Sequence, residues 1–340
     1  MSFQVTIQPS GHHYEVSSEE TVLSAALEAG YNLPYGCRNG ACGACKGQVL
    51  EGTVTHGHYQ PHALSEQEIA AGKALFCCAR PTTDLVIECR EVSAASGLRP
   101  RILPCRVEKL EHVAHDVMVM WLKLPSNERL QFAAGQYIEF LLKDGKRRAF
   151  SLANAPYDDT LLELHLRLIP GGQFTQYVFN EMKEKTILRL EGPLGSFFLR
   201  EDSDKPVIFI AGGTGFAPVK GIIEHALHHR MQRKMVLYRG VHALRDLYMN
   251  DLPLRWQAEH GIDYVPVLSD PMPEDNWSGR IGLVHQAVLQ DITDLSGYQI
   301  YCCGAPAMVE AAHCDFVAAG LPPDEFFSDA FTYAPPTPAK

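Results

Sequence analysis

The sequence lacks the features of a membrane-embedded or exported protein. Its 340 residues contain no apolar run close to the ~18 residues that a membrane-spanning helix needs. The first residues, MSFQVTIQPS, include neither a basic leader nor an apolar segment, so we expect no export signal. We therefore expect a cytoplasmic protein whose ten cysteines stay reduced, which makes disulfides a weak interpretation.

Positive charge is also scarce. Lys and Arg number 30 against 40 Asp and Glu, giving a formal net charge of -10. This balance repels phosphate backbones and anionic lipid headgroups, so neither nucleic acid nor a membrane surface is expected as a partner. Repeats and low-complexity tracts are absent as well, apart from the Pro-rich stretch YAPPTPAK.

The pattern of strands and helices changes twice along the chain, which predicts three domains. Residues 1–92 combine an FQVTI strand, two capped helices and a DLVIEC strand in a small α+β unit. Short alternating strands fill residues 101–202 and predict an antiparallel β-barrel. Over residues 205–331, strands alternate with helices, as in a parallel α/β sheet. We expect a linker at 93–103 and a loose tail at 332–340.

Capping boxes predict where the two helices of the first domain begin. Ser17 with Glu20 predicts one start, and Gly30 predicts the end of that helix. Ser65 with Glu68 predicts the second start. The stretch between these helices carries three of the six cysteines of the domain.

The stretch YGCRNGACGACKGQV places Cys37, Cys42 and Cys45 at a C-x4-C-x2-C spacing. A two-iron, two-sulfide (2Fe-2S) cluster needs four thiolates and backbone N–H groups directed at the sulfur atoms. The interspersed glycines allow the main chain to wrap that closely, whereas a zinc site has no such requirement. The spacing is typical of plant-type ferredoxins, so we predict a 2Fe-2S cluster over a zinc site or a disulfide.

The fourth ligand must come from LFCCARP, where Cys77 and Cys78 compete. On an extended segment adjacent side chains point to opposite sides, so we expect only one of them to face the loop. The two cysteine motifs resemble the ferredoxin domain of bacterial flavin-dependent electron-transfer reductases. That resemblance implies Cys77 as the ligand and Cys78 as a bystander. Four other cysteines are expected only to pack in the interior: Cys89, Cys105, Cys302 and Cys314.

The stretch KRRAFSLANAP matches the R-x-[YF]-S motif of the ferredoxin-NADP reductase-like flavoproteins. Arg148 can pair with a flavin phosphate, and the Phe150 ring can lie on the flat face of the flavin ring. The Ser151 hydroxyl can reach the N5 position of the flavin. Alone, RAFS would also fit an ordinary strand, but AGQYIEF, GGQFTQYVF and EGPLGSFFLR follow the order of such flavin domains. The resemblance implies FAD, with these contacts: Arg148, Phe150, Ser151, Leu152, Gly172 and Thr175.

The stretch VIFIAGGTGFAP joins a buried strand to a helix through glycines, so that a nucleotide pyrophosphate can approach the backbone. A plain tight turn is an equally good interpretation of this motif alone. Its partner is YCCGAPAM, which matches the C-G-x-x-x-M element of the same family beside the nicotinamide. The implied nicotinamide contacts are Gly212, Gly213, Thr214, Gly215, Cys303 and Gly304.

One position bears on the choice of nicotinamide. NADPH-using relatives commonly carry Arg directly after the Ser that ends the third strand, whereas here Asp270 follows Ser269. A carboxylate at that place disfavours a 2'-phosphate, so we expect NADH. Arg239 and Arg245, after the second strand, are alternative contacts for the ribose.

Residues 1–331 thus resemble one family, in the order ferredoxin, flavin and nicotinamide domain. The resemblance implies an α+β β-grasp ferredoxin domain, an antiparallel β-barrel flavin domain and an α/β Rossmann-like nicotinamide domain. GGTGFAPVK, FSLANAP and FFSDAF are similar to the CDP-6-deoxy-3,4-glucoseen reductase branch. Asp329 and Phe331 resemble the C-terminal acid and aromatic residue at the flavin of this family, which makes Ser151, Cys303 and Asp329 the candidates for catalysis.

Such a protein would accept a hydride from NADH on its flavin and release electrons singly through the cluster to a protein partner. The branch implies a CDP-4-keto-6-deoxyglucose 3-dehydrase-type acceptor. Reductases of ring-hydroxylating dioxygenases or monooxygenases have the same three modules, and a non-catalytic redox sensor or zinc-binding protein is the alternative of another class. Residues 1–92 carry five basic against ten acidic side chains, so we expect the acceptor to dock there.

Overall fold

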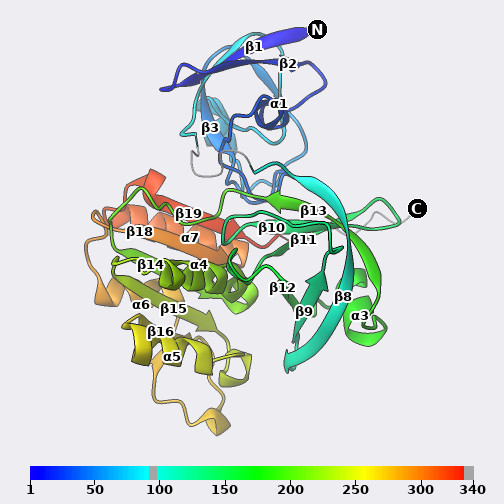
Figure 1. Cartoon of the computed structure of the whole chain (residues 1–340). Helices are drawn as coiled ribbons and strands as arrows, with labels where there is room; N and C mark the ends of the chain where they lie inside the picture. The colour runs from blue at the N-terminus through cyan, green and yellow to red at the C-terminus, as the bar shows by residue number, and fades with distance from the viewer. Residues whose placement is uncertain (92–97, 333–340) are drawn as a thin grey trace. The chain divides into compact units, whose positions relative to one another are not determined.

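The computed structural model describes residues 1–91 and 98–332, in two compact units, Met1–Leu98 and Arg99–Lys340 (Figure 1). Residues 92–97, which include the start of the linker expected at 93–103, and residues 333–340 of the expected tail lie outside the described residues. The last part of the expected linker is a strand instead, because β8 begins at Arg101. The finer division at 101–202 and 205–331 stays a prediction.

The first unit is built on a five-stranded mixed sheet in the order β2-β1-β7-β3-β5. β1 (Ser2–Gln8), which contains the predicted FQVTI strand, and β2 (His13–Ser17) form an antiparallel hairpin. β7 (Leu85–Glu88) pairs parallel with β1 and antiparallel with β3 (Lys46–Glu51). β5 (Lys73–Leu75) completes the sheet beside β3, and β4 (Val54–His56) with β6 (Ala79–Pro81) makes a separate two-stranded sheet.

Two short helices accompany this sheet, α1 (Val22–Glu28) and α2 (Glu66–Ala70). The predicted Ser65 capping box of α2 is confirmed. The Ser17 box is wrong: Ser17 pairs with Ser2 as the last residue of β2, so the sheet holds it extended. Thr21 caps α1 instead. The apolar side of α1 packs into one core with the inward residues of β1 and β7, as expected of a β-grasp domain.

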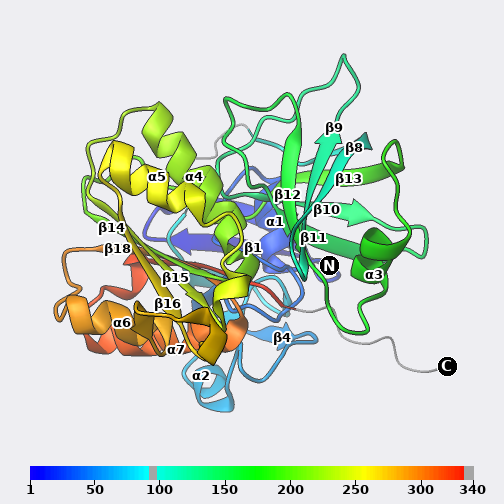
Figure 2. The same ribbon diagram turned by 90° about the horizontal axis from the view of Figure 1, so that it is seen from below.

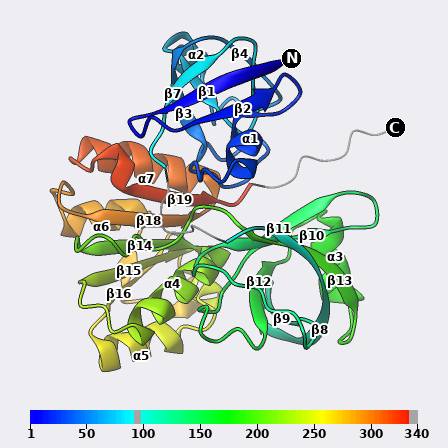
Figure 3. The same cartoon turned by 45° about the horizontal axis from the view of Figure 1, so that its top comes forward.

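The second unit begins with an antiparallel sheet of six strands in the order β11-β10-β13-β8-β9-β12. A bridge between Leu152 and Leu164 joins its two ends and closes it into the predicted barrel (Figure 3). One helix, α3 (Gln173–Asn180), accompanies it. The strands are β8 (Arg101–Ala114), β9 (Val117–Lys123), β10 (Tyr137–Leu141), β11 (Arg147–Ser151), β12 (Leu162–Arg167) and β13 (Ile187–Leu194).

A parallel sheet of six strands follows in the order β17-β16-β15-β14-β18-β19, with α4 and α5 on one face and α6 and α7 on the other (Figure 2). Its strands are β14 (Val207–Gly212), β15 (Met235–Val241), β16 (Asp263–Leu268), β17 (Arg280–Ile281), β18 (Gln299–Gly304) and β19 (Phe326–Ala330). Its helices are α4 (Phe216–His228), α5 (Asp251–His260), α6 (Val284–Asp291) and α7 (Pro306–Ala318). The order of the strands changes direction at β14 and β18, where a doubly wound sheet binds its ligand.

The barrel and the parallel sheet share part of their hydrophobic core. Val117, Ala134 and Phe197 of the barrel segment belong to the same buried cluster as Phe209 and Phe216 of the parallel sheet. The predicted fold class of all three segments is confirmed. Among the helices of the described residues, none has the length and apolarity to cross a membrane.

Candidate functional site

The cysteine loop holds Cys37 and Cys42 against each other. The Cys42 N–H donates to Cys37 Sγ and the Cys37 N–H donates to Cys42 Sγ, both at 3.3 Å, while the Ala41 N–H reaches Cys37 Sγ at 3.4 Å. The hydrogen bond from the Cys42 thiol lowers the pKa of Cys37 to about 6. Backbone N–H groups directed at sulfur are what an anionic iron-sulfur ligand set requires.

Two glycines make this close approach possible. Gly40 has φ +74°, and a Cβ there would lie 2.7 Å from the carbonyl oxygen of His58. A Cβ at Gly36 would lie 3.1 Å from Cys42 Sγ. A side chain at Gly40 would therefore both strain the backbone and collide with it.

Cys45 and Cys77 form a second pair. Both are buried, and the hydrogen bond that the Cys77 thiol donates to Cys45 raises the pKa of Cys77. The four predicted ligands are thus arranged two and two, Cys37 with Cys42 and Cys45 with Cys77. This arrangement fits a cluster of two irons that takes two thiolates at each iron.

Cys78 does not point away from Cys77 as expected. The two Sγ atoms are 3.5 Å apart. The reason is local: these residues lie in a turn, closed by the Cys78 N–H bonding the Leu75 carbonyl at 2.9 Å. The alternation of side chains that holds for an extended strand does not hold in a turn. A fifth thiol therefore lies next to the predicted fourth ligand.

The predicted flavin residues lie on β11, directly after it, and at the start of α3. The Phe150 ring packs with Phe140 and Phe174, at centroid distances of 5.8 and 5.7 Å. Arg148 is partly exposed and donates from Nη1 to the Arg147 carbonyl at 2.7 Å. Leu152 is buried at the bridge that closes the barrel.

Thr175 braces the turn at the start of α3. Its hydroxyl accepts from the Ile169 N–H and donates to the Gly172 carbonyl, both at 3.1 Å. Gly172 is the N-cap residue of α3 and provides no side chain to occupy the first amides of the helix. Backbone amides at the start of a helix are suited to binding a phosphate. The two hydrogen bonds of Thr175 fix the shape of the turn that carries these amides.

The three candidate catalytic residues come together from distant parts of the sequence. Ser151, at the end of β11, donates its hydroxyl hydrogen to Asp329 Oδ2 at 3.1 Å. Asp329 on β19 is the register partner of Cys303 on β18. Cys303 is fully buried. Burial is the main reason that its pKa lies well above the ordinary value, and the negative charge of the nearby Asp329 carboxylate raises the pKa further. The thiol is therefore neutral at physiological pH.

The glycine turn lies at the same end of the parallel sheet. β14 ends at Gly212 beside β18, and η2 (Gly213–Gly215) follows directly. A Cβ at Gly215 would lie 2.2 Å from the carbonyl oxygen of Cys303, so only glycine fits there. Gly304 in turn accepts a hydrogen bond from the Phe331 N–H at 2.8 Å. The structure brings the two predicted nicotinamide motifs and the C-terminal motif into contact.

Asp270 lies just beyond the carboxyl end of β16 and is exposed. Its N–H donates to the His242 carbonyl at 2.9 Å, which places it next to the end of β15. Arg245 is exposed in the nearby turn. The expectation for Arg239 is wrong, because its side chain is fully buried and packs on the rings of Phe216 and Tyr248.

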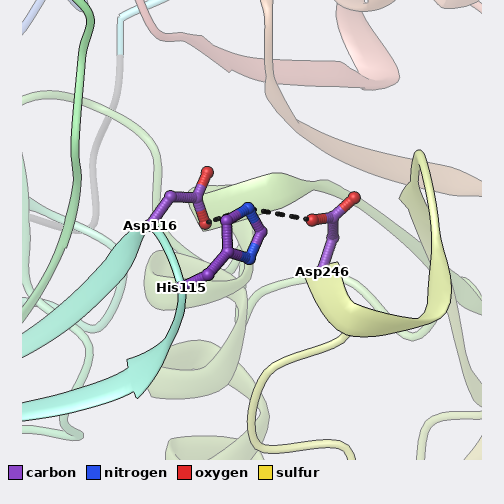
Figure 4. A group of neighbouring side chains, drawn as sticks. All are labelled: His115, Asp116 and Asp246. Atoms are coloured by element: carbon purple, nitrogen blue, oxygen red, sulfur yellow. Dashed lines mark ion pairs between the residues drawn. The ribbon is translucent and has the colours of Figure 1, made fainter.

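Histidines also occur at two places outside the predicted sites. In the HGHYQPH stretch (residues 56–62), His62 Nε2 lies 2.8 Å from the Ala41 carbonyl oxygen, and His56 packs on Tyr59. A group that sequence reasoning missed is formed by His115, Asp116 and Asp246, shown in Figure 4.

His115 Nε2 in this group lies 3.8 Å from Asp116 and 3.7 Å from Asp246. Arg167 already donates to Asp116 at 2.6 Å, and the Ala243 N–H donates to Asp246 at 3.0 Å. The group therefore lies where the barrel and the parallel sheet meet, and its two carboxylates already have hydrogen-bond donors. No feature of the sequence indicated it, because Asp246 is distant in the chain from His115 and Asp116.

The other cysteines differ in burial. Cys89, Cys105 and Cys302 are buried, as expected for residues that only pack. Cys314 is exposed on α7, so the expectation that it packs in the interior is wrong.

Three family models match the sequence in the order of the structural segments. A 2Fe-2S iron-sulfur cluster binding domain matches residues 5–82. An oxidoreductase FAD-binding domain matches residues 104–199, and an oxidoreductase NAD-binding domain matches residues 209–314.

Individual proteins match over almost the whole chain. The CDP-6-deoxy-L-threo-D-glycero-4-hexulose-3-dehydrase reductase of Yersinia pseudotuberculosis serotype I is 40% identical over 332 residues, covering 97% of this chain and 99% of that protein. The phenol 2-monooxygenase reductase component DmpP of Pseudomonas sp. strain CF600 is 36% identical over 340 residues, covering 97% and 95%. The crystal structure of the Amycolatopsis cytochrome P450 reductase GcoB matches with a TM-score of 0.78 and 36% identity, covering 97% and 99%.

Proposed function

Because the chain belongs to the family of iron-sulfur flavoprotein reductases that join a 2Fe-2S domain to FAD- and NAD-binding domains, we propose that it carries electrons from NADH to a protein acceptor. The predicted cofactor classes, a 2Fe-2S cluster, FAD and a nicotinamide nucleotide, are those of the three matched domains. When bound, these groups supply transfer of a hydride from nicotinamide to flavin and one-electron steps through the cluster.

The observation that carries the proposal is the convergence of Ser151, Asp329 and Cys303. The Asp329 carboxylate fixes the direction of the Ser151 hydroxyl through the 3.1 Å hydrogen bond. Ser151 belongs to the flavin motif, whereas Cys303 belongs to the nicotinamide motif, so this contact joins the two predicted binding sites. We assign Ser151 the role of a hydrogen-bonding group at the flavin. We assign the neutral Cys303 thiol the role of an uncharged packing contact beside the nicotinamide.

Other residues of the chain would hold the three groups. Phe150, backed by Phe140 and Phe174, offers a fixed ring for the flavin to pack against. The turn at Gly213–Gly215 offers backbone N–H groups to a pyrophosphate. The four ligand cysteines would hold the cluster: Cys37, Cys42, Cys45 and Cys77.

NADH rather than NADPH is part of the proposal and rests on Asp270. The exposed carboxylate lies at the carboxyl ends of β15 and β16, the edge of the sheet at which a nucleotide binds. A 2'-phosphate placed near it would be repelled. Arg239, which could have offset this repulsion, is buried.

For the acceptor we propose a CDP-4-keto-6-deoxyglucose 3-dehydrase-type enzyme. The name of the Yersinia relative, at 40% identity over almost the full length of both chains, supports this choice. A second candidate is a monooxygenase component, supported by the 36% identity to the phenol 2-monooxygenase reductase. We place the reaction in the cytoplasm, since cluster-binding thiolates need a reducing compartment.

The test uses the full chain loaded with flavin and iron, mixed without oxygen with NADH or NADPH. We expect NADH to bleach both the flavin and the cluster absorbance, and to do so with a much higher kcat/KM than NADPH. The reduced protein is then mixed with a purified dehydrase or with a purified phenol hydroxylase. Faster electron transfer to the dehydrase supports the proposed acceptor. Transfer only to the hydroxylase would favour the second candidate, and no bleaching by either nucleotide would contradict the function itself.

A further inference from the structure

A charged side chain is buried between the barrel and the parallel sheet. Lys220 on α4 is only 6% exposed, although it is a lysine. Its Nζ lies 3.1 Å from Glu163 Oε2 on β12, 3.0 Å from Glu224 Oε2 and 3.2 Å from the Ala153 carbonyl. These three acceptors satisfy the three donors of the ammonium group.

The buried polar contacts continue from Glu163 into the parallel sheet. His165 Nε2 lies 2.8 Å from Glu163 Oε1, and His165 Nδ1 lies 2.9 Å from the Tyr248 hydroxyl. Since Nε2 faces a carboxylate, that nitrogen carries the proton and Nδ1 accepts from Tyr248. The Tyr248 ring packs in turn against the buried Arg239 guanidinium, at 4.7 Å. The contacts run without a break from β12 of the barrel to β15 of the parallel sheet.

This chain of contacts joins the two predicted binding motifs. Ala153, which accepts from Lys220, comes two residues after Ser151 in the flavin motif. α4, which carries Lys220, begins directly after the glycine turn of the nicotinamide motif. A Cβ at Gly221 would lie 3.0 Å from the Asn154 carbonyl oxygen, so the helix also touches the backbone of the flavin-motif segment. The distance between the two motifs depends on this contact.

Burying charges here gives little net stability. A lysine and a glutamate lose hydration when they are buried, and apolar residues of the same size would avoid that loss. A buried ion pair is nevertheless directional, because a shift of either partner weakens the attraction between the two charges in a medium of low polarity. Such a pair opposes small displacements more strongly than an apolar contact would.

We propose that Lys220 and Glu163 are positioning residues for hydride transfer. They hold the helix after the glycine turn against the flavin-motif segment, and so fix the nicotinamide site relative to the flavin site. Neither residue needs to touch a cofactor for this role. The inference rests on the proposed function, since it concerns the step from nicotinamide to flavin.

The test compares Lys220→Met with the wild-type protein, both loaded with flavin and iron. Stopped-flow absorbance follows flavin reduction over a range of NADH concentrations, which separates the rate at saturation from the apparent Kd of NADH. We expect the rate at saturation to fall at least tenfold, with the flavin content and the apparent Kd unchanged within about twofold. Lys234→Met is the matched control, because Lys234 is 70% exposed and lies 3.8 Å from its partner Asp263. It should leave both values unchanged.

A second variant covers the case in which Lys220→Met does not fold. Glu163→Gln keeps the shape of the side chain and removes its charge, and it should lower the rate at saturation in the same way. If both variants fold, the double variant should be no slower than the slower single one, because the two residues act as one pair.

The outcomes separate the two proposals. If NADH reduces the wild-type flavin and both variants match its rate at saturation, the positioning role is overturned while the proposed function stands. Variants that only melt at a lower temperature, with an unchanged rate, overturn it equally. If NADH does not reduce the wild-type flavin, the proposed function fails and this inference fails with it.

Discussion

The Ser151 hydroxyl illustrates how much of this protein depends on single atoms. It is oriented by Asp329, a residue 178 positions later in the chain. The hydroxyl is buried, so its direction is set by the carboxylate and not by water. Replacing it should therefore affect the reaction more than the fold.

We expect Ser151→Ala to retain bound flavin and to slow its reduction by NADH. Loss of the hydroxyl removes an oriented hydrogen bond at the proposed reaction site, so the rate at saturation should fall about tenfold, which corresponds to about 1.4 kcal/mol. Stopped-flow absorbance measures this rate. Ser126→Ala, at an exposed serine of the same unit, is the control and should leave this rate unchanged. An unchanged rate in Ser151→Ala would remove this hydroxyl from the mechanism.

Cys77 and Cys78 allow a second test at the scale of the residue. Cys77→Ser should lose or strongly perturb the cluster absorbance, while NADH still reduces the flavin, because all four ligands lie in the first unit. Cys78→Ser should leave the iron content and the cluster spectrum close to those of the wild type. Iron analysis and electron paramagnetic resonance distinguish these cases. Loss of the cluster in Cys78→Ser, with Cys77→Ser spared, would place the ligand one residue later.

A site residue could be predicted from the sequence where its motif lies within a short stretch of the chain. Cys37, Cys42 and Cys45 stand within nine residues and carry a recognisable spacing. Lys220 and Glu163 are 57 positions apart, and each alone reads as an ordinary surface charge. Their pairing is created by the fold, so no local pattern indicated it. The 3.5 Å approach of Cys78 to Cys77 escaped prediction because it depends on a turn that was taken for an extended segment.

At the scale of elements, α4 and β12 meet at the buried ion pair. Burial alone would raise the pKa of Glu163, but the hydrogen bond from His165 and the charge of Lys220 hold it down at about 2, below the ordinary 4.5. A carboxyl group with a lowered pKa stabilises the fold in its ionised form. Its contribution is complete above the ordinary pKa and is lost as the pH falls from 4.5 towards 2.

This reasoning predicts a pH-dependent difference between the wild type and Glu163→Gln. The variant should be less stable near neutral pH, by roughly 3 kcal/mol at most, and the difference should shrink as the wild-type carboxyl is protonated in acid. Urea unfolding of both proteins at about pH 6 and at about pH 3 provides the measurement. A difference that is the same at both pH values would mean that Glu163 does not titrate as described.

The start of α1 shows that pairing between strands can override a local sequence signal for a helix start. The sequence predicted the strands of the barrel and the alternation of the parallel sheet, because periodic burial sets both patterns. It placed the start of α1 at Ser17, although pairing with Ser2 keeps that residue in β2. Pairing between strands is a non-local interaction, and here it moves the helix start to Thr21.

At the scale of the whole molecule, charge is unevenly shared. The first 92 residues carry a net charge of -5, half of the total of -10. Several of the acids are exposed, among them Glu15, Glu19 and Glu28. If a protein acceptor carries basic residues on its docking surface, they would attract it to the acidic residues of this unit.

We therefore expect electron transfer to the acceptor to slow as salt is added. The Debye length, over which exposed charges still interact, shrinks from about 10 Å at 0.1 M to about 3 Å at 1 M ionic strength. Transfer rates measured over this range should fall severalfold, and the combined variant Glu15→Gln, Glu19→Gln, Glu28→Gln should show a flatter dependence. A rate independent of salt in the wild type would favour an apolar interface.

The position of β19 has a consequence for how the protein is made. This strand, the last element of the described residues, provides the Asp329 that meets Ser151. A chain leaves the ribosome from its N-terminus, and domains fold in that order. The cysteine loop can therefore fold while most of the second unit is still being synthesised, whereas the contact between Ser151 and Asp329 must wait until the final strand emerges. A nascent chain would thus be able to acquire its iron before it can accept electrons from a nucleotide.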